Sequence, residues 1–270
     1  MNQRRSLGFS TLGNPLDSLL DSNRLASQFG LQFLELRSLE GSLDLPGYFE
    51  RQPLPAASVP ILVIDTSLCL LTAEAKEVED FYRFAELAKR LHTPYLRVFG
   101  RGGEEMGEAL SSNQLDQMAH WVFQIRQTFA QRKWRCKLLL ETHDIFSSAQ
   151  RCLALNNRLD VPLEILWDAH HTWRFSGEHP GQTWRQIGPW IAHIHYKDSI
   201  GVNNASEKFS YVAPGKGDYP TGALLETLFR AAYTGGISLE WEKMWHPELA
   251  SINTVLMDFC RIFQPEEPRQ

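Results

Sequence analysis

Short apolar runs alternate with longer amphipathic segments along the whole chain. The runs are almost continuously apolar, which is typical of strands buried on both faces. They predict strands at residues 6–12, 31–36, 60–65, 95–99, 137–141, 163–168, 191–195 and 237–240. Apolar residues at helical spacing predict helices at 16–29, 77–91, 115–129, 149–155, 183–187, 224–233 and 249–263. The helix between the second and third strands has the weakest pattern.

Eight strand–helix units in 270 residues favour a closed barrel over a doubly wound sheet. No linker-like or low-complexity segment divides the chain. We therefore predict an α/β protein whose residues 1–270 form a single (β/α)8 TIM barrel.

Composition narrows the class of protein. The net charge of −5 and the pI near 6.0 provide no basic surface for phosphates, so we expect no nucleic-acid partner. The amino-terminal apolar stretch is too short for a signal peptide or a membrane span, so we expect a cytoplasmic protein with no membrane partner. The cysteines are far apart and form no CxxC pair, which argues against a disulfide framework: Cys69, Cys136, Cys152 and Cys260.

Four consecutive strands in the second half end in metal-ligand side chains. These residues are Glu141, Asp168, His195 and Glu240. Chemistry on a barrel occurs at the carboxyl ends of its strands, so the four side chains are predicted to converge. Three carboxylates and one imidazole would bind one divalent cation. The oxygen-rich set favours Mn²⁺, Mg²⁺ or Co²⁺, and Zn²⁺ also tolerates it.

Each of these residues alone has a simpler interpretation. A carboxylate just after a strand often caps the next helix, and a single histidine there is more often a structural residue. His193 lies two residues before His195, on the same side of the strand, and is expected to pack in the barrel interior. The occurrence of suitable side chains on four strands in succession favours the metal site.

The second half of the chain also resembles a known family at five motifs. These are Glu141-Thr-His-Asp144, Asp168-Ala-His-His171, His195-Tyr-Lys-Asp198, Pro214-Gly-Lys-Gly217 and Leu239-Glu240. They are similar to the xylose-isomerase-like barrels, which include sugar and sugar-phosphate isomerases and epimerases and the class-IV-type apurinic endonucleases. The resemblance implies metal ligands at the same four positions and a substrate-contacting histidine at His171. In the first half, Gly8-Phe-Ser-Thr11 and Leu96-Arg-Val-Phe99 only look similar.

A divalent metal at this site suggests proton transfer on a hydroxy-carbonyl substrate. The ion would hold both substrate oxygens and stabilise an enediolate while Glu141 and Glu240 remove and return the proton. His171 and His143 would hold hydroxyl groups, and Lys197 or Lys216 would neutralise developing charge or a phosphate.

The histidine pair and the tryptophans leave alternatives open. Strand alternation places His170 on the side of Asp168, whereas the family spacing nominates His171, which we predict. Trp241, Trp173 and Trp245 could form an apolar wall against a sugar ring. For Trp241 and Trp245, packing at the barrel rim is favoured slightly over substrate contact.

Two departures from the family patterns restrict the reaction. The endonuclease branch needs further histidines on the third and fourth strands, but Ile64-Asp65-Thr66 and Arg97-Val-Phe99 contain none. The ketohexose epimerases usually have an arginine six residues after the seventh-strand histidine, where this chain has Gly201. The sequence therefore favours a metal-dependent isomerase or epimerase of a sugar, sugar derivative or cyclitol.

The alternatives are a dehydratase of a keto-polyol or inosose with the same site and, less favoured, a non-catalytic binding barrel or an apurinic endonuclease. Oligomeric state, metal identity and phosphorylation of the substrate stay open.

Overall fold

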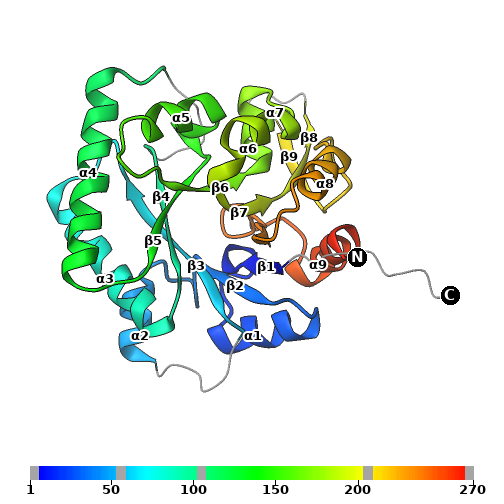
Figure 1. The fold of residues 1–270 in the computed structure, drawn as a ribbon. Coiled ribbons are helices and arrows are strands. Elements are labelled where there is room, and N and C mark those ends of the chain that lie inside the picture. Colours follow the sequence, from blue (N-terminus) through cyan, green and yellow to red (C-terminus); the bar gives the residue numbers. More distant parts are fainter. Residues whose placement is uncertain (1–5, 53–58, 102–107, 203–208, 265–270) are drawn as a thin grey trace.

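The computed structural model describes residues 6–52, 59–101, 108–202 and 209–264. In this part of the chain, eight parallel strands close into a barrel in the order β1-β10-β7-β6-β5-β4-β3-β2. Helices surround the barrel (Figure 1). The predicted (β/α)8 barrel is confirmed. Its strands are β1 Ser6–Ser10, β2 Phe33–Leu36, β3 Ile61–Cys69, β4 Tyr95–Phe99, β5 Lys137–Glu141, β6 Glu164–Asp168, β7 Ile191–Tyr196 and β10 Gly236–Leu239.

The helices follow the predicted pattern with one addition. The segment with the weakest pattern does form a helix, α2, because Asp44 accepts a hydrogen bond from the Gly47 N–H and a proline lies in the first turn. A helix directly after Asp168, α6, was not predicted. The helices are α1 Leu19–Gln28, α2 Leu45–Arg51, α3 Ala75–Leu91, α4 Ser112–Gln131, α5 Ala149–Asn156, α6 Ala169–Ser176, α7 Pro180–Ile187, α8 Thr221–Arg230 and α9 Ile252–Phe263.

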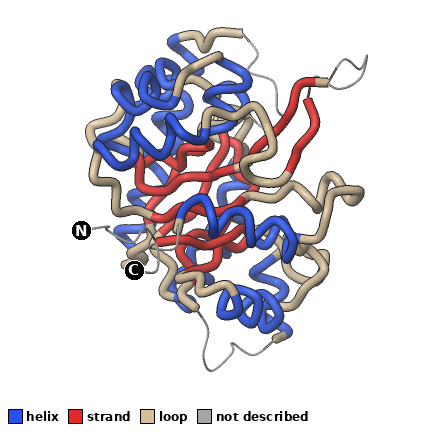
Figure 2. Tube along the Cα trace, turned by 90° about the vertical axis from the view of Figure 1, so that its right-hand side faces the viewer, coloured by secondary structure: helices blue, strands red, loops and turns tan. Residues whose placement is uncertain are grey.

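A two-stranded antiparallel ribbon is inserted between β7 and α8. It consists of β8 (Asp198–Gly201) and β9 (Phe209–Val212), and the sequence pattern did not predict either strand. Figure 2 shows the ribbon projecting beyond the barrel. The Asp198 carboxylate fixes its base by accepting hydrogen bonds from the backbone N–H groups of Ser199, Gly215, Gly217 and Tyr219.

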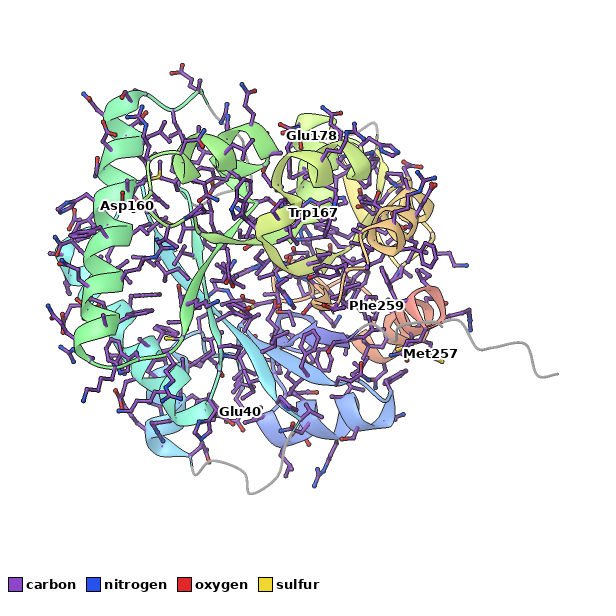
Figure 3. All side chains as sticks on the ribbon, viewed as in Figure 1. Glu40, Asp160, Trp167, Glu178, Met257 and Phe259 are labelled. Carbon is purple, nitrogen blue, oxygen red and sulfur yellow. The ribbon has the colours of Figure 1, made fainter. Side chains whose placement is uncertain are left out.

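Strand alternation orients the side chains of each strand. Leu166 packs inside the barrel with Val63 and Leu139. Its neighbour Trp167 points outward to the helices (Figure 3), where its ring lies 6.1 Å from that of Trp184. Because alternate residues share a face, Asp168 returns to the interior, one layer above Leu166.

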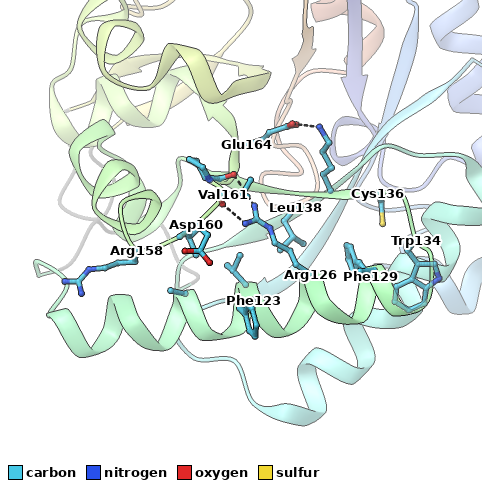
Figure 4. Close-up of a pocket in the computed structure, with 16 residues that line it drawn as sticks. Phe123, Arg126, Phe129, Trp134, Cys136, Leu138, Arg158, Asp160, Val161 and Glu164 are labelled. Atoms are coloured by element: carbon cyan, nitrogen blue, oxygen red, sulfur yellow. Dashed lines mark hydrogen bonds and ion pairs between the residues drawn. The ribbon is translucent and has the colours of Figure 1, made fainter.

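A groove on the outside of the barrel lies at the opposite end from the strand carboxyl termini (Figure 4). It separates α4 from the connection between α5 and β6, and Lys137 and Glu164, the first residues of β5 and β6, form an ion pair beside it. Arg126 donates hydrogen bonds to the carbonyl oxygens of Val161 and Pro162. Among the described residues, no helix combines the length and the apolar character needed to cross a membrane.

Candidate metal centre and active site

Four side chains from four neighbouring strands meet at the carboxyl end of the barrel. Glu141 ends β5, Asp168 ends β6, His195 lies in β7, and Glu240 follows β10. All four are buried, and one potential ligand atom from each lies within 4.8 Å of the others. The structure therefore brings together the four residues that the sequence singled out.

The four side chains fit a divalent cation. In the described part of the chain, one buried atom of each makes no hydrogen bond of regular geometry and is held only by charged neighbours within the centre: Glu141 Oε1, Asp168 Oδ2, His195 Nδ1 and Glu240 Oε2. A metal bound at about 2.1 Å from each donor requires donors no more than roughly 4.2 Å apart. The set thus closes around an ion with small shifts. Carboxylate and imidazole donors would hold Mn²⁺, Mg²⁺, Co²⁺ or Zn²⁺ here.

The carboxylates of the centre have different proton affinities. Burial raises the pKa of Glu141, but the Arg97 guanidinium and His195 more than offset this and lower that pKa to about 2. Burial also raises the pKa of Asp168, and with Glu240 and Glu141 nearby it reaches about 7 despite Lys197. Burial opposes ionisation of Glu240, yet His195 and Lys197 keep its pKa well below the usual value. At neutral pH, Glu141 and Glu240 are therefore ionised, whereas Asp168 is only partly ionised.

Lys197 lies among these carboxylates rather than facing solvent. Its Nζ is 2.9 Å from Asp168 Oδ2, and 2.5 Å from both Glu240 Oε2 and Glu242 Oε1. Burial lowers the pKa of this amine, but the three carboxylates raise it well above its usual value. Lys197 thus stays charged and partly neutralises the centre. Lys216, the other lysine considered from the sequence, is exposed.

Sequence reasoning missed a layer of charged residues beneath the centre. Arg97 Nη1 lies 2.5 Å from Glu141 Oε2, and its Nε lies 3.7 Å from Asp65 Oδ1. Glu35 Oε1 lies 2.7 Å from His195 Nε2. A carboxylate within an apolar strand, as in Phe33-Leu-Glu35-Leu36, is the signal that could have identified them, because buried charges need partners.

Glu35 itself is held by further partners. Its Oε2 lies 2.7 Å from His193 Nε2 and accepts a hydrogen bond of 3.0 Å from the Ser238 hydroxyl. His193 is fully buried, as the prediction of an interior histidine requires. Glu35 therefore links β2, β7 and β10 beneath the centre.

The two adjacent histidines of α6 point to different surroundings. The backbone N–H of His171 donates to Asp168 Oδ1 at 2.9 Å, and its Nδ1 lies 3.4 Å from Asp168 Oδ2. His170 Nε2 instead lies 2.7 Å from the Ser199 hydroxyl oxygen, although one of its ring nitrogens also lies within 4.8 Å of ligand atoms of Asp168 and His171. The helix starts at Ala169, so the chain leaves extended geometry at once and His171 turns back over Asp168. Its contact with a substrate stays a prediction.

The remaining predicted substrate residues differ in position. His143 lies beside the centre, with its ring 4.7 Å from that of His171. Trp241 is 2% exposed and donates its indole N–H to the Ala250 carbonyl, which supports the packing alternative. Trp245 is 52% exposed, and Trp173 packs its ring 5.5 Å from that of Tyr219.

Comparison with known proteins gives a family match over most of the chain. The model of a family described as xylose isomerase-like TIM barrel matches residues 53–256. A 3-dehydroshikimate dehydratase of Bacillus anthracis is 30% identical over 126 residues, 46% of this chain and 43% of that protein. A 3'-dehydrocarminate deglycosidase alpha subunit of a Microbacterium species is 39% identical over 70 residues, 26% of this chain and 17% of that protein. The matched segments span less than half of either relative.

Solved structures share the fold across nearly the whole chain. The probable 3-DHS dehydratase AsbF of Bacillus anthracis has a TM-score of 0.78 at 20% identity, covering 97% of this chain and all of that one. The IolI protein with a bound zinc atom has a TM-score of 0.76 at 15% identity, covering 98% and 100%. An L-ribulose 3-epimerase has a TM-score of 0.70 at 16% identity, covering 96% and 93%. These structural similarities support the assignment of the TIM-barrel fold.

Proposed function

This chain belongs to the xylose isomerase-like TIM barrel family, and from that premise we propose that it is a metal-dependent enzyme acting on a small polyol. The reaction is proton transfer next to a carbonyl group of a sugar, sugar derivative or cyclitol, with isomerisation or epimerisation as the outcome. The observation that carries the proposal is the convergence of Glu141, Asp168, His195 and Glu240, whose potential ligand atoms are buried and lie within 4.8 Å of one another.

The proposed cofactor is one divalent ion. When bound, it would polarise the substrate carbonyl and lower the cost of removing the neighbouring proton. The residues of the chain supply the remaining chemistry.

Glu141 and Glu240 are the proposed proton carriers. The low pKa of each means that both are ionised at neutral pH, so either can accept a proton. Arg97 donates a hydrogen bond to Glu141 Oε2, and the other carboxylate oxygen, Oε1, faces the centre. His171 and His143 lie beside Asp168 and are proposed to hold substrate hydroxyl groups, while Lys197 limits the build-up of negative charge.

A dehydratase is the second candidate. The Bacillus anthracis relative is named a 3-dehydroshikimate dehydratase. Elimination of water next to a carbonyl starts with the same proton abstraction and differs only in the leaving group, so the same residues serve both reactions.

Metal analysis followed by a deuterium exchange assay tests the proposal. The purified protein should bind one equivalent of Mn²⁺, Co²⁺ or Zn²⁺ and incorporate solvent deuterium at carbon across a panel of keto-polyols. Label without loss of water indicates isomerisation or epimerisation, and loss of water indicates the dehydratase. Glu141→Gln and Glu240→Gln should abolish incorporation, whereas Glu164→Gln, at the other end of the barrel, should not.

A protein that takes up no divalent metal contradicts the proposal. A metal-loaded protein that binds polyols without any exchange would support the non-catalytic binding barrel instead.

A further inference from the structure

Six rings form a continuous arc at the carboxyl end of the barrel. They come from segments that follow different strands: Phe99 ends β4, His143 follows β5, His171 and Phe175 lie in α6 after β6, and Phe209 and Tyr211 lie in β9 after β7. Because all of these segments follow strand carboxyl ends, the arc lies on the same side of the molecule as the metal centre.

Each ring of the arc contacts the next. The centroids of Phe99 and His143 are 4.7 Å apart, as are those of His143 and His171. The following separations are 5.3 Å to Phe175, 6.1 Å to Phe209 and 5.2 Å to Tyr211. These distances lie in the range of direct aromatic contacts, so the six rings form one connected cluster.

Both ends of the arc adjoin the metal centre. The Arg97 guanidinium lies 3.8 Å from the centroid of the Phe99 ring, and Lys197 Nζ lies 5.8 Å from that of Tyr211. Arg97 pairs with Glu141 and Lys197 pairs with Asp168, Glu240 and Glu242. Since both cations are already neutralised by carboxylates, the arc presents ring surface to a ligand rather than positive charge.

The arc is not simply an extension of the core. Phe99, His143, Phe175 and Phe209 are each partly exposed. Of the described residues, Tyr211 belongs to the hydrophobic core and Phe209 packs against it, but Phe99 and Phe175 do not belong to it. Partly exposed rings next to a polar centre are typical of a ligand pocket, where apolar walls bury the ligand and a few polar groups orient it.

We propose that the substrate carries a planar unsaturated ring beside its polyol part, and that this ring lies against the arc. The inference rests on the proposed function, because the metal centre holds the polyol part. Flat rings gain from edge and face contacts with aromatic side chains, which a saturated ring or an open chain of equal size does not match.

Two matched probes test the inference on the metal-loaded protein. Phenyl β-D-glucopyranoside and cyclohexyl β-D-glucopyranoside share the polyol and differ in the flatness of the attached ring. Calorimetry should show tighter binding of the phenyl probe by roughly two- to tenfold, the gain expected of one aromatic pair. In Phe175→Leu and Phe209→Leu this ratio should fall toward one.

Two further variants control for general damage. Phe175→Tyr keeps the ring and should keep the ratio. Phe123→Leu changes a ring that is 51% exposed in the groove of Figure 4, at the other end of the barrel, and should leave the ratio unchanged.

Equal affinities for the two probes, no binding of the phenyl probe, or a ratio insensitive to Phe175→Leu and Phe209→Leu would overturn the inference. These failures are separate from failure of the proposed function. If the protein binds metal and exchanges protons but binds both probes equally, only the role of the arc is contradicted. If it prefers the phenyl probe but binds no metal, only the proposed reaction is contradicted.

Discussion

The Nε2 atom of His195 lies 2.7 Å from Oε1 of Glu35, while its Nδ1 faces Glu240 Oε2 at 3.1 Å. A carboxylate opposite Nε2 favours a proton on that nitrogen and leaves the lone pair of Nδ1 for a metal. We therefore expect Glu35 to position His195 for the proposed metal ion.

Replacing Glu35 should weaken metal binding. We expect Glu35→Gln to raise the dissociation constant for Zn²⁺ or Mn²⁺ roughly 10- to 100-fold, the usual cost of losing such a partner. Competition with a chromophoric chelator measures it without reference to activity. Glu164→Gln is the matched control, because Glu164 pairs with Lys137 at the far end of the barrel. Equal constants for the parent and Glu35→Gln would contradict the assignment.

Removing the Arg97 side-chain charge should destabilise the fold. Arg97→Met leaves Glu141 and Asp65 buried without their cation, which should cost about 3–5 kcal/mol in the free energy of unfolding. Denaturant titration checks this. Arg97→Met combined with Glu141→Gln should recover part of the loss, because the second change removes an uncompensated charge.

The control for Arg97 is an exposed arginine. Arg83 pairs with Asp44 and Glu50 on the surface, so Arg83→Met should cost less than about 1 kcal/mol. If Arg97→Met and Arg83→Met lower the free energy of unfolding by similar amounts, the buried ion pairs of Arg97 do not stabilise the fold more than exposed ones.

Gly8 in β1 should not tolerate even one added carbon. A Cβ at this position would lie 2.3 Å from the Phe33 ring and 2.6 Å from the Phe33 carbonyl oxygen of the neighbouring strand β2. We expect Gly8→Ala to lower the free energy of unfolding by about 1–3 kcal/mol through overpacking.

Gly222→Ala provides the comparison for Gly8→Ala. No atom lies within 4 Å of a Cβ at Gly222 in α8, so alanine there should be neutral or stabilise the protein by up to about 1 kcal/mol. A stable Gly8→Ala variant would show that β1 and β2 can separate freely.

The reactivity of Cys136 should depend on pH in a defined direction. Burial raises the pKa of this thiol to about 12. The thiolate is the reactive form, so at pH 8 only on the order of one molecule in ten thousand presents it, and alkylation should speed up as pH rises toward 12. Timed iodoacetamide labelling with peptide mapping should find Cys69 and Cys260, which are partly exposed, modified first. Labelling of Cys136 as fast as Cys69 at pH 8 would contradict this order.

The sequence by itself determined the strands and the residues at their ends. Buried parallel strands are local apolar runs, and Glu141, Asp168 and His195 end such runs within a few residues, so the pattern is readable without distant contacts. The sequence did not predict the helix after Asp168, because the histidine, threonine and tryptophan residues in Ala169–Ser176 form no clear apolar stripe.

Only the tertiary structure decided how the centre is supported. Glu35 meets His193 across 158 residues, and Arg97 meets Glu141 across 44. No local pattern specifies such pairs, because they form when the barrel closes and forces buried charges to find partners. The same closure places the β8–β9 ribbon beside α6, and so creates the aromatic arc from rings that are far apart in the sequence.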